Sequence, residues 1–130
     1  MPAVTILYPR NFFSPAQKAE FVSVVMQSVA THMDAIDPET NERTQFADDP
    51  GRFIDLVMIP YSKADSRVTT PLLATIVSYE WPDRMRNIKK RVKRITREVR
   101  EAIPLGHVRE GSEAISFTFI EKHPGAWSAA

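Results

Sequence analysis

The feature of this 130-residue chain that most constrains its fold is a pattern of strand, helix and strand that occurs twice. Pro2 and Pro71, each just ahead of an apolar extended stretch, lie 69 positions apart, and so do Ser14 and Asp83, where the two predicted helices start. Few residues are identical between the copies, as expected of an old fusion of two βαβ units. We therefore predict a single domain over residues 1–130, made of two halves at about 1–66 and 67–130.

In the first half, residues 3–8 are predicted to form a strand. A helix is predicted from Ser14, because a side-chain cap there precedes proline at the first helical position. Its apolar residues recur every four positions: Phe21, Val25, Val29 and Met33. Residues 48–51 predict a turn, and residues 53–59 predict a second strand that is apolar at nearly every position, as in strands covered on both faces.

In the second half, we predict a strand over 72–79, a helix that begins at 81–83 and a strand over 114–120. Each strand–helix–strand unit is a right-handed crossover with parallel strands. The predicted fold is α/β (α+β): a four-stranded sheet with both helices on one face. The strand over 53–59 has apolar side chains on both faces, and no element remains to cover the second one. We expect another subunit to cover it.

Composition excludes several kinds of protein. Cysteine is absent, which excludes disulfides, thiolate catalysis and cysteine-based metal sites. No apolar run reaches the roughly 18–20 residues that span a membrane, and no secretory signal is visible, so we expect a cytoplasmic protein with no membrane partner. Residues 83–101 hold nine Lys or Arg against three acidic residues, but these cations form the solvent side of the predicted helix. With a net charge of +1, we expect no nucleic-acid partner.

The opening Pro2-Ala3-Val4-Thr5-Ile6, the duplicated βαβ plan, the length and the closing "FIEKHPGAWS" together resemble the tautomerase superfamily. Its members are built from βαβ units, begin with proline after Met, and assemble as trimers of fused units or hexamers of single units. Length matches best the group of cis-3-chloroacrylic acid dehalogenase and malonate semialdehyde decarboxylase. The resemblance implies a homotrimer that acts on a small carboxylate substrate without a cofactor or metal.

The resemblance also implies that Pro2 is catalytic. If Met1 is removed, the ring nitrogen of Pro2 becomes a secondary amine, whose pKa desolvation and nearby cations lower toward neutrality. An acid or base with a pKa near the working pH is the efficient one. With Met1 retained, the nitrogen is an acylated amide and this chemistry is closed. The alternative is that Pro2 only shapes the start of a strand.

A carboxylate substrate calls for an arginine, whose planar fork matches a carboxylate. The resemblance implies an arginine pair just after the third strand, where Arg84 matches one position, Trp81 occupies the other, and Arg86 is a substitute one turn around. The alternative is that Arg84 and Arg86 are solvated residues at a helix start. Arg10, in the loop after the first strand, is a further candidate.

The remaining positions decide which reaction we expect. Thr118 stands where the dehalogenases use a tyrosine, and Val29 where they use a histidine; His32, one turn later, is expected at the surface or an interface. For the acidic residue of the decarboxylases, the chain offers Glu39, Asn41 and Glu42. Trp127 is a candidate for an apolar wall at the site. We therefore favour enol–keto proton transfer. The alternatives are dehalogenation, hydration or decarboxylation of a three-carbon acid, and a tautomerase-like subunit of low or no activity that serves for binding or structure.

Overall fold

The computed structural model describes residues 2–104 and 114–122. Along the chain these residues form β1 (Ala3–Pro9), α1 (Pro15–His32), the short 3₁₀ helix η1 (Phe46–Asp48), α2 (Pro50–Phe53), β2 (Asp55–Tyr61), η2 (Lys63–Asp65), β3 (Leu72–Tyr79), α3 (Pro82–Met85), α4 (Ile88–Glu101) and β4 (Ile115–Lys122). None of these helices has the length and apolar character needed to cross a lipid bilayer.

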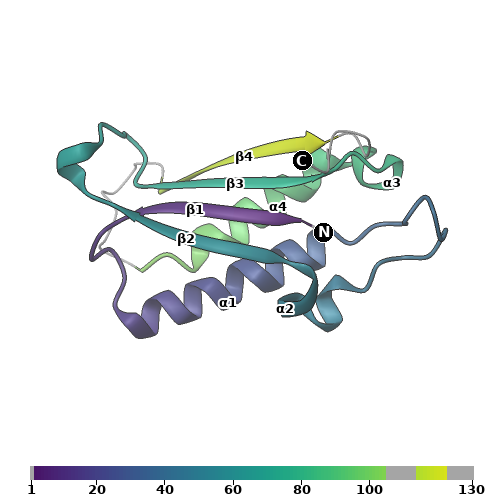
Figure 1. The fold of residues 1–130 in the computed structure, drawn as a ribbon, viewed down its shortest axis with the longest axis horizontal. Helices are drawn as coiled ribbons and strands as arrows, with labels where there is room; N and C mark the ends of the chain where they lie inside the picture. Colours follow the sequence, from purple (N-terminus) through teal and green to yellow (C-terminus); the bar gives the residue numbers. More distant parts are fainter. Residues whose placement is uncertain (1, 105–113, 123–130) are drawn as a thin grey trace, which may run out of the picture.

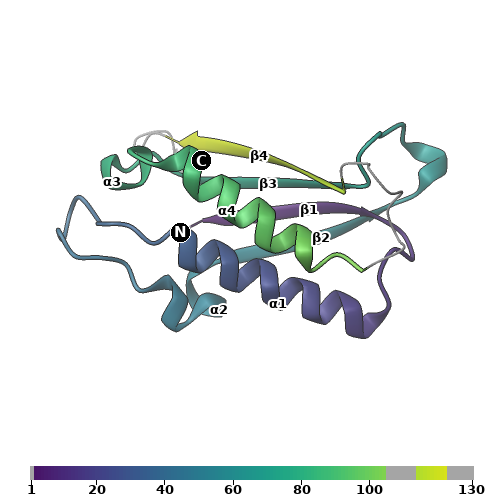
Figure 2. The same cartoon turned by 180° about the vertical axis from the view of Figure 1, so that it is seen from behind.

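The four strands form one sheet in the order β2-β1-β3-β4. β1 pairs with β2 and β3 pairs with β4 in parallel, while β1 and β3 run antiparallel at the centre. α1 and α4 lie side by side across one face of this sheet (Figures 1 and 2). The predicted fold class, a four-stranded sheet of two βαβ units with its helices on one face, is confirmed.

The core lies between the sheet and these two helices. Alternate residues of β1 and β3 point toward the helices and are buried, as a period of two requires. They pack with the apolar side of α1 and α4. The buried set includes Val4, Ile6, Leu72, Ala74 and Ile76 from the strands and Phe21, Val25, Val29, Ile95 and Val99 from the helices.

The other face of the sheet has no helix over it, and we call it the open face. Val57 and Ile59 of β2 lie on it and are 55% and 42% exposed. The strand register places Leu7, Leu73 and Ile120 on the same face. The expected apolar character of β2 on both sides is therefore present, and within one chain only the side that faces the helices is covered.

α1 begins as predicted. The Ser14 hydroxyl accepts a hydrogen bond from the Gln17 N–H at 3.2 Å, and the Gln17 side chain accepts one from the Ser14 N–H at 2.9 Å. This reciprocal pair is a capping box, with Pro15 at the first helical position.

Two predicted elements differ from the structure. β2 begins at Asp55 rather than at residue 53, because residues 50–53 form the helical turn α2, and the predicted turn over 48–51 runs from the end of η1 into the start of α2. The second predicted helix is broken in two: α3 ends at Met85 and α4 begins at Ile88, with Asn87 outside helical geometry at φ −138°.

Candidate functional site

Pro2 lies at the start of β1 and is fully buried. Its carbonyl accepts a hydrogen bond from the N–H of Asp55 at 3.2 Å, which joins it to the start of β2. On the other side, Ala3 pairs with Val77 in the antiparallel register, so Pro2 continues that register opposite Ser78. Residues opposite each other in such a pair have Cβ atoms about 4.5–5.5 Å apart. Pro2 therefore lies next to the Ser78 side chain.

The Arg84 side chain is buried behind Ser78 and is only 1% exposed. Its Nη1 donates to Ser78 Oγ at 2.7 Å and to the Tyr79 carbonyl at 2.9 Å, while Nε and Nη2 both donate to the Met33 carbonyl. Burial lowers the pKa of this guanidinium to about 10, so it stays charged at neutral pH. Arg84 is therefore not a solvated residue, and its donors are bound to protein atoms rather than open to a carboxylate.

Trp81 separates two hollows at this end of the sheet. Its ring stacks on Tyr79 with centroids 6.4 Å apart, and the Arg84 guanidinium carbon lies 4.9 Å from its centroid. The first hollow, which we call the Arg43 hollow, has a volume of about 460 Å³. It is lined by Asp37, Glu42, Arg43, Thr44, Gln45, Phe46, Phe53 and Trp81. The second, the Glu39 hollow, has about 310 Å³ and is lined by Asp37, Pro38, Glu39, Tyr79 and Trp81.

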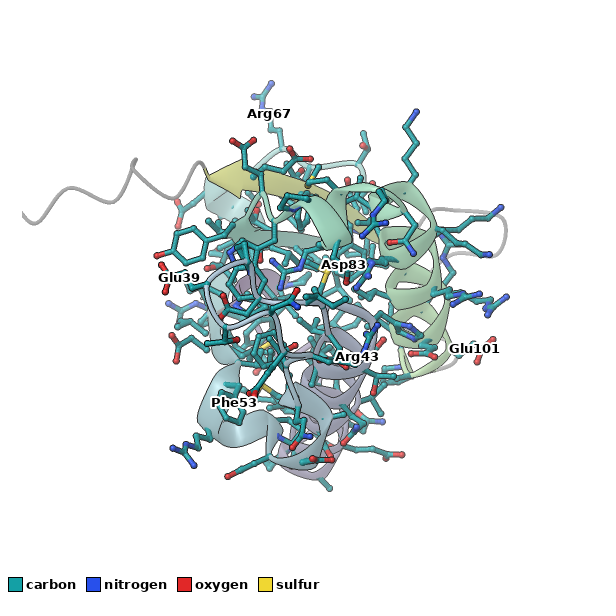
Figure 3. All side chains as sticks on the ribbon, turned by 90° about the vertical axis from the view of Figure 1, so that its right-hand side faces the viewer. Glu39, Arg43, Phe53, Arg67, Asp83 and Glu101 are labelled. Carbon is teal, nitrogen blue, oxygen red and sulfur yellow. The ribbon has the colours of Figure 1, made fainter. Side chains whose placement is uncertain are left out.

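The Arg43 hollow spans the end of the sheet at which β1 begins. Phe53 lies two residues before β2 and Trp81 two residues after β3, and β1 runs between these two strands. The hollow therefore lies at the same end of the sheet as Pro2, but Pro2 is fully buried and does not line it. Figure 3 looks at this end of the molecule, with Arg43, Phe53 and Asp83 labelled on it.

The loop between α1 and η1 positions Asp37 and Arg43. The Asp37 N–H donates to the Glu42 carbonyl at 2.9 Å, and Asn41 turns the chain with φ 57°. An Asp37 carboxylate oxygen accepts the Glu39 N–H at 2.8 Å. The tight turn places Asp37 in the walls of both hollows.

Asp83 ties this loop to α3. One carboxylate oxygen accepts the N–H of Ile36 at 2.9 Å, and the other pairs with Arg86 at 3.2 Å. Arg86 is at the Pro2 end of the sheet, and its side chain is 75% exposed. The structure thus brings Pro2, Arg84 and Arg86 to one end of the sheet.

The other predicted site residues lie elsewhere. Arg10 is exposed at the far end of β1, roughly 25 Å from Pro2 by strand length, where it lines a small hollow of about 170 Å³ with Lys63. Thr118 is exposed on the open face, paired with Thr75. Trp127 lies outside the described residues. Within one chain, Arg10 and Thr118 are not brought to Pro2.

His32 differs from its expected place at the surface or an interface. Its Nε2 lies 2.9 Å from a carboxylate oxygen of Glu98, so it joins α1 to α4 within one chain and its side chain is largely buried. Sequence reasoning did not single out Asp37, Arg43 and Phe53, which line the Arg43 hollow. Most of their stretch looked like a polar connection, and no periodic pattern showed that it forms the wall of a hollow at this end of the sheet.

No protein-family model matches the chain, and no curated protein matches its sequence. Three solved structures are similar to it in fold. W0 fused 4-OT, a symmetric trimer, has 14% identity, covers 95% of this chain and 88% of its own, and gives a TM-score of 0.60. FG41 malonate semialdehyde decarboxylase inhibited by 3-bromopropiolate has 14% identity, coverage of 98% and 88%, and a TM-score of 0.59. A probable enzyme from Aspergillus fumigatus has 16% identity, coverage of 98% and 79%, and a TM-score of 0.64.

At these identities the likeness concerns the fold, and it extends over nearly the whole of this chain. The chain shares the fold of these structures, which confirms the predicted tautomerase-like fold.

Proposed function

We propose that this chain, after removal of Met1, is an isomerase that uses the amine of Pro2 for enol–keto proton transfer on a small 2-oxo or unsaturated carboxylate. The observation that carries the proposal is the Arg43 hollow, which has Phe53 and Trp81 in its wall and lies at the end of the sheet at which β1 begins. A substrate in this hollow would lie at the same end of the sheet as the residue that would carry the free amine.

The surroundings of Pro2 suit this chemistry. Burial of Pro2 and the charged Arg84 guanidinium beyond Ser78 both disfavour an ammonium ion there, and both therefore favour the neutral amine. The neutral amine accepts the proton of the enol hydroxyl. As the enol oxygen becomes the carbonyl oxygen, the electron pair of the C=C bond forms a C–H bond at the neighbouring carbon. The proton for this bond comes from the Pro2 ammonium, so the neutral amine is regenerated.

The test compares two changes at the amino terminus. Pro2→Ala keeps a free primary amine and should retain part of the activity with a shifted pH optimum. One glycine inserted ahead of Pro2 converts the nitrogen to a planar amide and should abolish turnover of phenylenolpyruvate. The mass of the intact native protein, measured by mass spectrometry, must be lower than that of the full sequence by one methionine residue. Equal activity of the extended and native proteins would leave Pro2 as a strand-entry residue.

We also propose that the protein is a homotrimer whose open faces point inward. The uncovered apolar side chains of β2 support this, and so does the trimeric state of the fused 4-OT structure. In such an assembly, Arg10 and Thr118 of one subunit would serve a Pro2 of another, because neither reaches the Pro2 of its own chain.

A second candidate function is hydration or decarboxylation of a three-carbon acid. It is favoured by Asp37, a carboxylate that lines both hollows beside Trp81 and could activate water there. Asp37→Asn should then abolish hydration or decarboxylation while enol–keto transfer persists. If neither reaction is detected with a free Pro2 amine, the chain is a binding or structural member of its fold.

A further inference from the structure

We infer that Arg43 binds the substrate carboxylate, and that the aromatic wall of the Arg43 hollow selects a substrate with a flat apolar substituent over a three-carbon acid. This inference rests on the proposed function, because it names the anchor and the substrate class of the same site.

Among the described residues that line this hollow, Arg43 is the only one with a positively charged side chain. Its side chain is 59% exposed, and its one described partner is Asp34, at 3.6 Å. That separation is too long for a hydrogen bond, so the planar N–H fork is open to a carboxylate. Arg84, in contrast, donates hydrogen bonds to protein atoms from Nε, Nη1 and Nη2.

Three aromatic side chains form the apolar part of the hollow. Phe46 is buried, with its ring centroid 5.5 Å from that of Phe53. Trp81 also lines the hollow and contacts Tyr79 and Arg84. A substrate of three carbons would leave these surfaces in water, whereas a ring or a similar flat group would cover them and fill more of the 460 Å³.

Two carboxylates, Asp37 and Glu42, also line the hollow. Glu42 is exposed, so water screens its charge, and one oxygen of Asp37 already accepts the Glu39 N–H. The buried Arg84 guanidinium adds positive charge beneath Trp81. The ligand carboxylate therefore belongs at the Arg43 side, with the apolar group against the aromatic wall.

The experiment measures binding without turnover. The protein with one glycine inserted ahead of Pro2 is titrated with phenylpyruvate and with pyruvate by isothermal calorimetry. We expect phenylpyruvate to bind at least tenfold more tightly. Arg43→Gln should weaken the binding of both acids at least tenfold. Phe53→Ala should weaken the binding of phenylpyruvate and leave the affinity for pyruvate unchanged. Arg67→Gln, an exposed arginine between β2 and β3 at the opposite end of the sheet, is the matched control and should bind as the parent does.

Equal affinities for the two acids would overturn the inferred substrate class, and Arg43→Gln binding like the parent would overturn the anchor. Loss of binding in Arg86→Gln instead would move the anchor to Arg86. These results are separable from the proposed function. A native protein that catalyses the reaction without dependence on Arg43 keeps the function and refutes this inference. A native protein that binds with the expected pattern but has no activity refutes the function and supports the ligand class of the hollow.

Discussion

At the scale of single residues, the arginines near Pro2 differ in what their guanidinium groups contact. Arg84 is enclosed by the end of α1 and the end of β3, and its hydrogen bonds join these two elements. Arg43 and Arg86 extend into solvent from the loop and from the residue after α3. The buried Arg84 holds this end of the molecule together and adds positive charge to it, while the guanidinium groups of Arg43 and Arg86 are available to a ligand.

We predict that Arg84→Met lowers the free energy of unfolding by about 3–5 kcal/mol, because it removes the buried donor to the Met33 carbonyl and the Ser78 hydroxyl, while the Tyr79 carbonyl keeps the Trp81 N–H. Arg86→Met, at an exposed position in the same segment, should change it by less than about 0.5 kcal/mol. Urea denaturation at equal protein concentration measures both. A stable Arg84→Met protein that has lost only activity would assign Arg84 to the substrate instead.

The sequence allowed both arginines to be placed just after the third strand, but it did not show which one faces inward. The inward direction is set by tertiary contacts, since Arg84 donates to the Met33 carbonyl after α1 and to the Ser78 hydroxyl of β3. Helical periodicity from residue 83 to 102 fits one helix as well as two, so the break between α3 and α4 could not be derived from local pattern either.

At the scale of elements, the start of α1 is the part of the fold that local sequence determines best. Ser14, Pro15 and Gln17 carry the complete signal, and each has its expected role. β2 was harder to predict, because its apolar run continues backward through Ile54 and Phe53. Pro50 favours a helical turn there, and Phe53 packs on Phe46 instead of entering the strand.

We predict that Ser14→Ala lowers the free energy of unfolding by about 1 kcal/mol, because the Gln17 N–H loses its acceptor at the helix start. The matched control is Ser23→Ala, an exposed serine in the interior of the same helix. Alanine has the higher helix propensity, so this change should leave stability equal or slightly raised. Equal losses at the two positions, measured by urea denaturation, would contradict a capping role for Ser14.

The contact between α1 and α4 carries a pH dependence. Hydrogen bonds from Ser28 at 2.6 Å and from His32 lower the pKa of Glu98. A carboxyl whose pKa is lower in the folded state stabilises the fold above its unfolded pKa, near 4.5, and loses that contribution as the pH falls through the folded value. We predict that the stability difference between the parent and Glu98→Gln shrinks as the pH is lowered from 6 to 3.

Denaturation curves recorded at each pH measure this difference. Ser28→Ala removes the main cause of the shift, so it should weaken the acid-side dependence while the Glu98 carboxyl is still present. If the difference between the parent and Glu98→Gln is the same at all pH values, the hydrogen bonds of Glu98 do not contribute to stability in the way that the structure indicates.

At the scale of the whole molecule, the two faces of the sheet are unequal. One is covered by α1 and α4, while the other presents Val57, Ile59 and Ile120 to solvent. Exposed apolar groups that gather on one face are typical of an interaction surface. The period-two pattern of the strands was enough to predict this from sequence. It could not show which residues line a hollow at the Pro2 end of the sheet, because that depends on how the 33–53 stretch folds there.

The proposed homotrimer depends on this open face, and we predict that Val57→Asp disrupts it. A carboxylate there would be buried at the subunit interface without a partner, which costs several kcal/mol, whereas on a single chain it stays in water. Sedimentation equilibrium at micromolar concentration should give the parent three times the chain mass of 14.8 kDa, and Val57→Asp a mass near that of one chain.

The control is Val68→Asp, since Val68 is also an exposed valine but lies in the connection between β2 and β3 rather than on a strand. This variant should sediment like the parent. A parent protein that is monomeric, or a Val57→Asp protein that stays trimeric, would show that the open face is not the surface through which the chains assemble.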